Sequence, residues 1–221
     1  MTREINVTIW SDIGCPWATL ALHTLHDAAA RSAVRLDITH RNFPLELFNG
    51  VPTPKGLLDI EMAGIGGLRP DLAWRPWAAA DATYPVTTLP AMAAVRATTI
   101  SQGNAAADQL DTALRAALFV ESRCISLNPV ILEVAGECPL LNAETLATDL
   151  AAGAGVADVY ADWRAAQELN VQGSPQLEVA DQVLVNPGVG EMTWSLGSGE
   201  GFLRVDSYDP GWAVTLVDES K

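Results

Sequence analysis

Residues 5–18 read INVTIWSDIGCPWA, and this stretch decides the fold. Its first half, 5–11, is rich in β-branched and aromatic residues, which is typical of a strand. From Pro16 onward apolar residues recur at helical spacing, and a proline early in a helix lacks only an N–H that has no partner there. Cys15 therefore stands where a strand ends and a helix begins. The free N–H groups and the helix dipole at such a position favour a thiolate, which predicts a nucleophilic sulfur.

The rest of the chain continues this alternation and then interrupts it. Residues 34–40 alternate apolar and polar side chains, so strand, helix and strand form a βαβ unit with a parallel strand pair. Residues 44–76 are rich in proline and glycine and predict a loop with short helical pieces. The remaining patterns predict only helices over 89–150, a helix over 157–170, a hairpin of 176–179 with 183–185, and a last helix near 210–217.

This order predicts an α/β fold that carries an α-helical insertion. Strands occur only in the first and last parts of the sequence, and the helical block lies between them. We therefore expect one α/β domain built from residues 1–50 and 155–221, with residues 51–154 as the insertion.

Composition limits the classes of function. The 221 residues are 49% hydrophobic and 18% charged, which is enough to bury a sizeable core. A formal net charge of −14 repels phosphate groups, so neither nucleic acid nor an anionic membrane surface is expected as a partner. No apolar run is long enough to span a bilayer, and no signal-peptide pattern follows Met1. The expected location is the cytoplasm.

The other cysteines and the histidines carry weaker signals. Cys124 and Cys138 lie far from Cys15 in the sequence, which argues against a disulfide framework. They are expected in the core, although one of them could serve as a distant resolving thiol. The three histidines, His23, His26 and His40, have no further ligand at metal-binding spacing. They are expected at the surface or rim, and no metal site is predicted.

Three stretches together show a family resemblance. They are Trp10–Trp17, which contains Trp-Ser-Asp and Cys-Pro-Trp; residues 113–128; and residues 165–175, which end in Gly-Ser-Pro. The chain resembles the DsbA-like branch of the thioredoxin superfamily, and within it the FrnE-like group. That group is similar to 2-hydroxychromene-2-carboxylate isomerases and kappa-class glutathione transferases. The resemblance implies a thioredoxin-like fold with an α-helical insertion domain, and a cis peptide bond before Pro175.

The chain departs from this family at one decisive position. Family oxidoreductases carry Cys-Pro-Trp-Cys, whereas this sequence has Ala18 in place of the second cysteine. A dithiol cycle needs a resolving thiol beside the attacking one. Cys15 alone would therefore need a low-molecular-weight thiol such as glutathione or mycothiol as co-substrate, with no other cofactor. The isomerase and transferase relatives usually have serine at the position of Cys15.

The resemblance also assigns the site residues. Cys15 is the expected catalytic residue, although a buried and inert cysteine or a decayed site is the competing interpretation. Ser11 and Asp12 are expected either to cap the helix or to contact a ligand. The other expected substrate-binding residues shape a groove beside the sulfur and are Pro16, Trp17, Ala18, Ser174 and Pro175.

Three hypotheses for the function follow. The first is a thiol–disulfide oxidoreductase that acts through Cys15 on protein or small-molecule thiols and disulfides. The second is a glutathione-dependent isomerase or transferase. The third is a non-catalytic module that binds peptides in a thioredoxin groove. The sequence leaves open whether the chain forms a homodimer.

Overall fold

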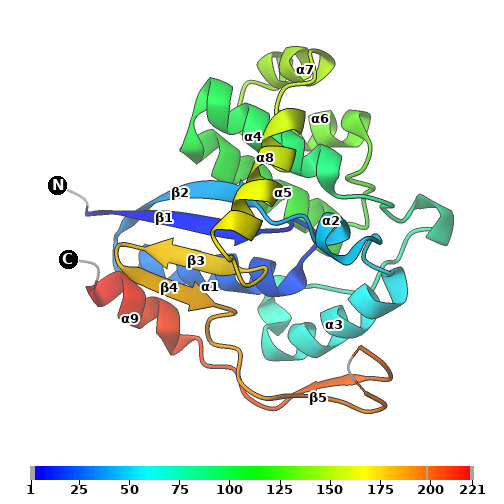
Figure 1. The fold of residues 1–221 in the computed structure, drawn as a ribbon, viewed down its shortest axis with the longest axis vertical. Coiled ribbons are helices and arrows are strands. Elements are labelled where there is room, and N and C mark those ends of the chain that lie inside the picture. Colours follow the sequence, from blue (N-terminus) through cyan, green and yellow to red (C-terminus); the bar gives the residue numbers. More distant parts are fainter. Residues whose placement is uncertain (1–2, 198, 220–221) are drawn as a thin grey trace.

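A computed structural model describes residues 3–197 and 199–219 (Figure 1). The outermost residues of the predicted α/β domain, 1–2 and 220–221, lie outside the described residues. The elements follow in chain order as β1 Glu4–Ser11, α1 Pro16–Arg31, β2 Arg35–Asn42, α2 Leu45–Asn49, α3 Lys55–Leu68, η1 Pro70–Leu72, η2 Asp81–Thr83, α4 Leu89–Gln102, α5 Asn104–Phe119, α6 Asn128–Gly136, α7 Ala143–Ala151, α8 Val156–Glu168, β3 Gln176–Val179, β4 Gln182–Val185, β5 Met192–Trp194, β6 Leu203–Val205 and α9 Gly211–Glu219.

The central sheet has four strands in the order β2-β1-β3-β4. β1 runs parallel to β2, with Ile9 opposite His40, and antiparallel to β3, with Ile9 opposite Leu177. β3 and β4 form the antiparallel hairpin. The predictions of a βαβ unit and of a late hairpin are therefore confirmed. β1 lies between β2 and β3. The loop after β1 and the start of α1 are therefore held at the middle of the sheet.

Two helices cover one face of this sheet. Ile5, Val7 and Ile9 of β1 form a buried cluster with apolar residues of α1 and α9, and Figure 1 shows both helices beside the strands. On the other face Trp10 and Phe43 pack against α8 residues. Along β1 the buried Ile5, Val7 and Ile9 alternate with the polar Asn6 and Thr8, and the strand is buried on both faces only from Ile9 to Ser11.

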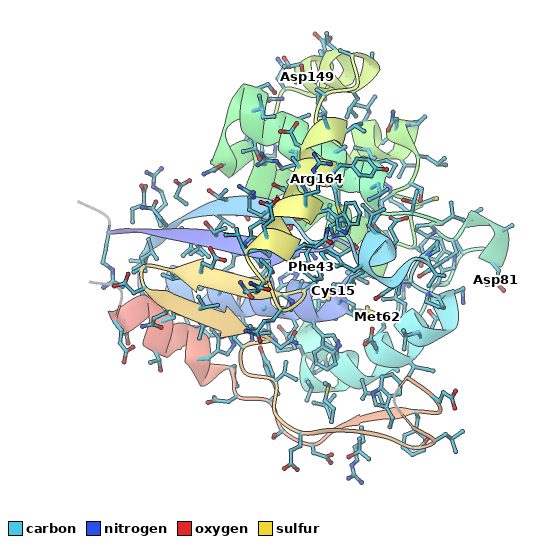
Figure 2. The ribbon with its side chains drawn as sticks, in the orientation of Figure 1. Cys15, Phe43, Met62, Asp81, Asp149 and Arg164 are labelled. Carbon is cyan, nitrogen blue, oxygen red and sulfur yellow. The ribbon has the colours of Figure 1, made fainter. Side chains whose placement is uncertain are left out.

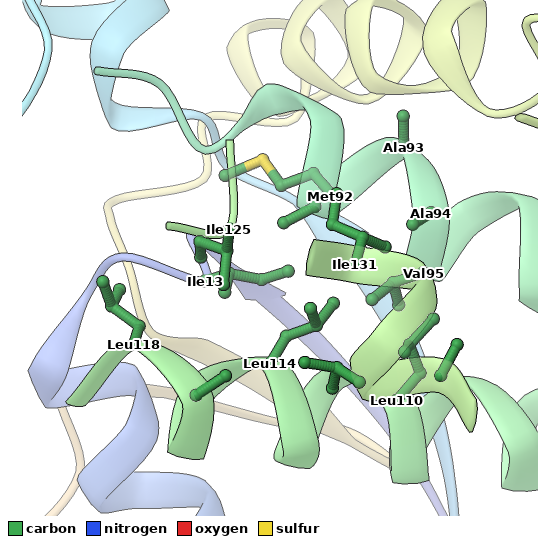
Figure 3. Close-up of a cluster of buried hydrophobic side chains, with 14 of the residues drawn as sticks. Ile13, Met92, Ala93, Ala94, Val95, Leu110, Leu114, Leu118, Ile125 and Ile131 are labelled. Atoms are coloured by element: carbon green, nitrogen blue, oxygen red, sulfur yellow. The ribbon is translucent and has the colours of Figure 1, made fainter. Parts of the chain in front are cut away.

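The helices between β2 and β3 build a separate core. Leu110, Leu114 and Leu118 recur every four residues along α5, and they pack with residues of α4 and α6 (Figure 3). Ile13, from the loop that precedes α1, enters the same cluster. That loop therefore joins the sheet to the helical region. The domain boundaries given above stay predictions. No helix of the described residues combines the length and apolar character needed to cross a bilayer.

The prediction of a loop with short helical pieces over 44–76 is wrong, because α3 is a helix of 14 residues. Gly64, Gly66 and Gly67 lie inside this helix rather than in the flexible loop that their spacing indicated. A Cβ at Gly64 would stand 3.3 Å from Leu203 Cδ2, so a small residue lets β6 pack closely on α3. Tertiary packing thus overrides the low helix propensity of glycine.

The prediction that the histidines lie at the surface is wrong for His40, which is only 4% exposed. Its Nε2 lies 2.9 Å from Asp108 Oδ1, and His26 Nε2 lies 3.4 Å from the other oxygen of the same carboxylate. Asp108 is on α5, far from both histidines in sequence, so local spacing could not reveal the pairing. Among the described residues no group of three or more side chains has the geometry to hold a metal ion.

Candidate active site

Cys15 occupies the N-cap of α1, where the loop after β1 turns into the helix. Its backbone N–H donates to the Asp12 carbonyl at 3.1 Å, and Pro16 takes the first helical position. Its thiol donates to the Ser174 carbonyl, with the sulfur 3.1 Å from the oxygen. The Ser174–Pro175 peptide bond is cis, as the resemblance implied, and lies beside the sulfur. Figure 2 labels Cys15 near the middle of the molecule.

The Cys15 thiol is covered, with 4% of the residue exposed. Burial raises the pKa of this thiol to about 11, and the negative charges of Glu61 and Asp12 raise it further. Hydrogen bonds from the Ser174 side chain and from the backbone N–H of Ala18 lower the pKa, but by less than burial raises it. The prediction of a thiolate at rest is therefore wrong. The start of the helix does not compensate for the lost hydration, and the resting sulfur carries a proton at neutral pH.

This protonation state predicts the alkylation behaviour of Cys15. Only the thiolate reacts with iodoacetamide, so the rate at Cys15 should rise about tenfold per pH unit from pH 8 to pH 10. No plateau is expected in that range, because the pKa of the thiol is about 11. Peptide mass spectrometry of stopped samples would follow Cys15 separately from Cys124 and Cys138. A plateau between pH 8 and pH 10 would contradict the protonated resting state.

Asp12 fixes the loop that leads to the cysteine. Its carboxylate oxygens accept from the N–H groups of Gly14 at 2.7 Å and Leu45 at 2.8 Å, while its own N–H donates to Ser174 Oγ at 2.9 Å. Burial raises the pKa of the Asp12 carboxyl to about 6. Neither Ser11 nor Asp12 caps α1, whose N-cap is the cysteine itself, so that prediction is wrong. A ligand contact by either residue stays a prediction.

Arg115 of α5 is a buried residue beside the candidate site that the sequence analysis missed. It is 1% exposed, and its guanidinium spans from the helical region to the loop before Cys15. The sequence did contain a signal for this residue, namely an Asp and an Arg four residues apart on the apolar face of a predicted helix. The guanidinium donates to the Asp111 carboxylate, to Ser11 Oγ and Thr19 Oγ1, and to the carbonyls of Asp12 and Ile13.

The first turn of α1 supplies the remaining predicted groove residues. Pro16, Trp17 and Ala18 are all buried, and Ala18 is 0% exposed. The Trp17 indole N–H donates to Glu61 Oε1 of α3 at 3.1 Å. Burial raises the pKa of the Glu61 carboxyl, although the hydrogen bond from Trp17 opposes this. Glu61 was also missed, because residues 44–76 were read as mainly loop.

A small cavity lies behind the loop that carries Cys15. Its volume of about 20 Å³ is room for about one water molecule. Asp12 and Gly14 line it, together with Glu46, Tyr84, Thr87 and Thr88. Cys15 does not line this cavity.

The other two cysteines are free thiols. Cys138 is buried just after α6 and donates to the Val134 carbonyl, with the sulfur 3.4 Å from the oxygen. Cys124 is half-buried in the loop that follows α5. Only Cys138 is therefore a core residue as expected. A resolving role for either thiol stays a prediction.

The sequence profile of the DSBA-like thioredoxin domain matches residues 6–194. This range holds Cys15, the whole helical region and the cis-proline loop. The chain belongs to the DsbA-like thioredoxin family. The fold and family expected from the three stretches are therefore confirmed. No curated protein matches this DsbA-like chain in sequence.

Solved structures share the fold of this DsbA-like protein at low identity. The cytosolic disulfide reductase DsbM from Pseudomonas aeruginosa with GSH is 21% identical, with a TM-score of 0.61 over 82% of this chain and 89% of that one. A putative protein disulfide isomerase from Nitrosomonas europaea is 12% identical, with a TM-score of 0.65 over 98% and 97%. A 2-hydroxychromene-2-carboxylate isomerase is 16% identical, with a TM-score of 0.58 over 81% and 88%. These matches support the fold alone.

Ala18, the residue that differs from the family motif, lies in the first turn of α1. The Ala18 N–H faces the Cys15 sulfur, so the residue that replaces the second cysteine stands directly beside the first. Cys15 is thus the single thiol of this turn. This turn therefore offers no second thiol that could resolve a disulfide formed at Cys15.

Proposed function

We propose that this protein catalyses thiol–disulfide exchange through Cys15 alone, and that a small thiol such as glutathione or mycothiol regenerates the free cysteine. One observation carries the proposal. The sulfur stands at the start of α1, 3.1 Å from the Ser174 carbonyl, beside a cis proline. Ala18 occupies the place of a resolving thiol. No metal or bound cofactor enters the chemistry.

The reaction balances in two exchanges. Cys15 loses its proton and attacks one sulfur of a substrate disulfide, which forms a mixed disulfide and releases the other half as a thiol. A free small thiol then attacks the mixed disulfide, leaves with the substrate sulfur as a new disulfide, and returns Cys15 to its thiol. The leaving thiolate takes up a proton in each step, and no net oxidant is consumed.

The proposed substrates are disulfides of proteins or of small molecules. Ser174 and Pro175 would support an extended chain through their backbone groups, and Trp17 would cover it. We also propose that the protein works in the cytoplasm, where small thiols are abundant and reduced; the cytosolic reductase with GSH has the same fold. Homodimer formation stays a prediction.

A second candidate function is favoured by the protonation of Cys15. A buried thiol with a pKa of about 11 is a poor nucleophile but a competent hydrogen-bond donor. It could donate to the sulfur of bound glutathione, in the place where isomerase and transferase relatives usually have serine. The chain would then be a glutathione-dependent isomerase or transferase.

Cys15→Ser separates the two functions. The assay follows reduction of bis(2-hydroxyethyl) disulfide by reduced glutathione, and Cys124→Ser is the matched control. Under the exchange proposal, Cys15→Ser loses activity by about 1000-fold or more, because no sulfur remains to attack. Mass spectrometry of acid-stopped protein should show a disulfide adduct on Cys15. Cys124→Ser should retain full activity, because under this proposal a small thiol and not Cys124 resolves the mixed disulfide.

Two other outcomes would overturn the exchange proposal. Equal exchange by the wild type and Cys15→Ser would assign the reaction to another group. No exchange by the wild type, with glutathione binding by calorimetry unchanged in Cys15→Ser, would favour the isomerase or transferase function. No exchange and no glutathione binding would leave only the peptide-binding module.

A further inference from the structure

A protonated thiol must lose its proton before it can attack, and water reaches Cys15 poorly. Cys15 packs in a buried cluster with Trp17, Leu20 and Ile65. Deprotonation by free hydroxide would create a buried thiolate beside two carboxylates, which the charges of Glu61 and Asp12 both oppose. The site therefore needs a local group that takes the proton and removes a negative charge in the same step.

Two contacts place Glu61 near the start of α1. Ile65, one turn later on α3, packs in the same buried cluster as Cys15. Residues four apart share one face of a helix, so Glu61 also faces the start of α1. The hydrogen bond of 3.1 Å from the Trp17 indole holds its carboxylate there, two residues from the cysteine.

The electrostatics agree with this placement. The charge of Glu61 raises the pKa of the Cys15 thiol more than the charge of Asp12 does, although Asp12 is close in the chain. Coulomb interaction weakens with distance, so the Glu61 carboxylate is the stronger electrostatic neighbour of the sulfur. The two carboxylates also differ in their contacts. Asp12 already accepts from two backbone N–H groups, whereas Glu61 is held by a single indole donor.

We propose that Glu61 accepts the proton that leaves Cys15 as the sulfur attacks a disulfide, and returns it to the departing thiolate. The inference rests on the proposed exchange function. Before the transfer the pair is a thiol and a carboxylate, and after it a thiolate and a carboxylic acid. One negative charge is present in both states, so the transfer adds no buried charge. The thiolate then attacks without a charged neighbour at Glu61.

Glu61→Gln tests this role, because a glutamine oxygen can still accept from the Trp17 indole. The exchange assay with glutathione and bis(2-hydroxyethyl) disulfide should slow by roughly 100-fold, a typical loss for a missing general base. The pKa of Cys15, titrated through thiolate absorbance against Cys15→Ser, should fall, because a nearby negative charge is gone. Glu144→Gln, an exposed change on α7, is the matched control and should alter neither value.

The test is decisive because a lower pKa of Cys15 alone would speed exchange, whereas loss of the proton acceptor would slow it. A lowered thiol pKa with equal or faster exchange would show that Glu61 acts only as a charge, and would overturn the inference. If Glu61→Gln does not fold, Glu61→Asp keeps a carboxylate. The rate of mixed-disulfide formation at Cys15 with bis(2-hydroxyethyl) disulfide alone should then level off above the pKa of that carboxyl, and a tenfold rise per pH unit throughout pH 4 to 8 would also overturn the inference. Absence of exchange in the wild type would instead overturn the proposed function itself.

Discussion

Replacing Arg115 with methionine will lower the free energy of unfolding by about 3–5 kcal/mol, the usual cost of removing one partner of a buried ion pair. Arg115 is 1% exposed, and Asp111 is nearly as buried. Methionine leaves the Asp111 carboxylate without its counter-charge. It also leaves the carbonyls of Asp12 and Ile13 without the guanidinium donor, and each buried group that loses its partner adds to the loss.

Urea unfolding at pH 7 measures this change, and Arg123→Met is the matched control. Arg123 also pairs with carboxylates, but those of Glu121, Glu133 and Glu137 are far more exposed than that of Asp111. Exposed pairs contribute little, so the control should lose less than about 1 kcal/mol. An equal loss in the two variants would contradict the structural role given to Arg115.

The double variant Arg115→Met with Asp111→Leu distinguishes two roles of Arg115, which are to neutralise the Asp111 carboxylate and to hold the loop before Cys15. It removes both charges at once, and buried pairs replaced by apolar residues are often neutral in stability. Stability should therefore recover in part, while the loop carbonyls before Cys15 stay without their donor. Exchange activity should be low in Arg115→Met and should stay low in the double variant. Full recovery of both stability and activity would show that the guanidinium does not position this loop.

Arg115 also shows why part of the site could not be predicted. The strand over 5–11, the helix from Pro16 and the hairpin after Pro175 follow from local patterns, and the structure confirms them. Arg115 reaches loop residues about one hundred positions away in sequence. Local periodicity carries no information about such a contact, although a charged pair on an apolar helix face signals that a buried partner exists.

The sequence predicted the position of Cys15 but not the protonation of its thiol. The strand-to-helix junction placed Cys15 correctly at the start of α1. Its pKa depends on how much water the folded protein excludes, and the cover comes partly from α3 and β6. A glycine-rich sequence did not predict α3, so neither the burial of the sulfur nor the role of Glu61 could be seen. The cis bond at Pro175 was implied only by the family resemblance.

Ala18→Cys will give the site an intramolecular disulfide and allow it to resolve a mixed disulfide without a small thiol. Ala18 is in the first turn of α1, and its N–H faces the Cys15 sulfur, so a thiol at residue 18 would stand beside the first. An internal thiol acts at a very high effective concentration, and resolution of the mixed disulfide should accelerate on the order of 1000-fold or more. Oxidation by glutathione disulfide would form the new bond and release two glutathione molecules.

Three measurements check this variant against Ala18→Ser, which adds a side chain of similar shape without sulfur. Thiol counting after oxidation should show that Ala18→Cys loses both thiols of the motif, and its intact mass should fall by two hydrogens. Refolding of a reduced substrate protein should then proceed with the oxidised variant alone, while Ala18→Ser stays inactive as an oxidase. Ala18 is fully buried, so added atoms cost about 1–3 kcal/mol in both variants. If Ala18→Cys folds as well as Ala18→Ser but keeps both thiols free, the first turn of α1 does not hold the two positions in bonding geometry, and the explanation for the single-cysteine site fails with it.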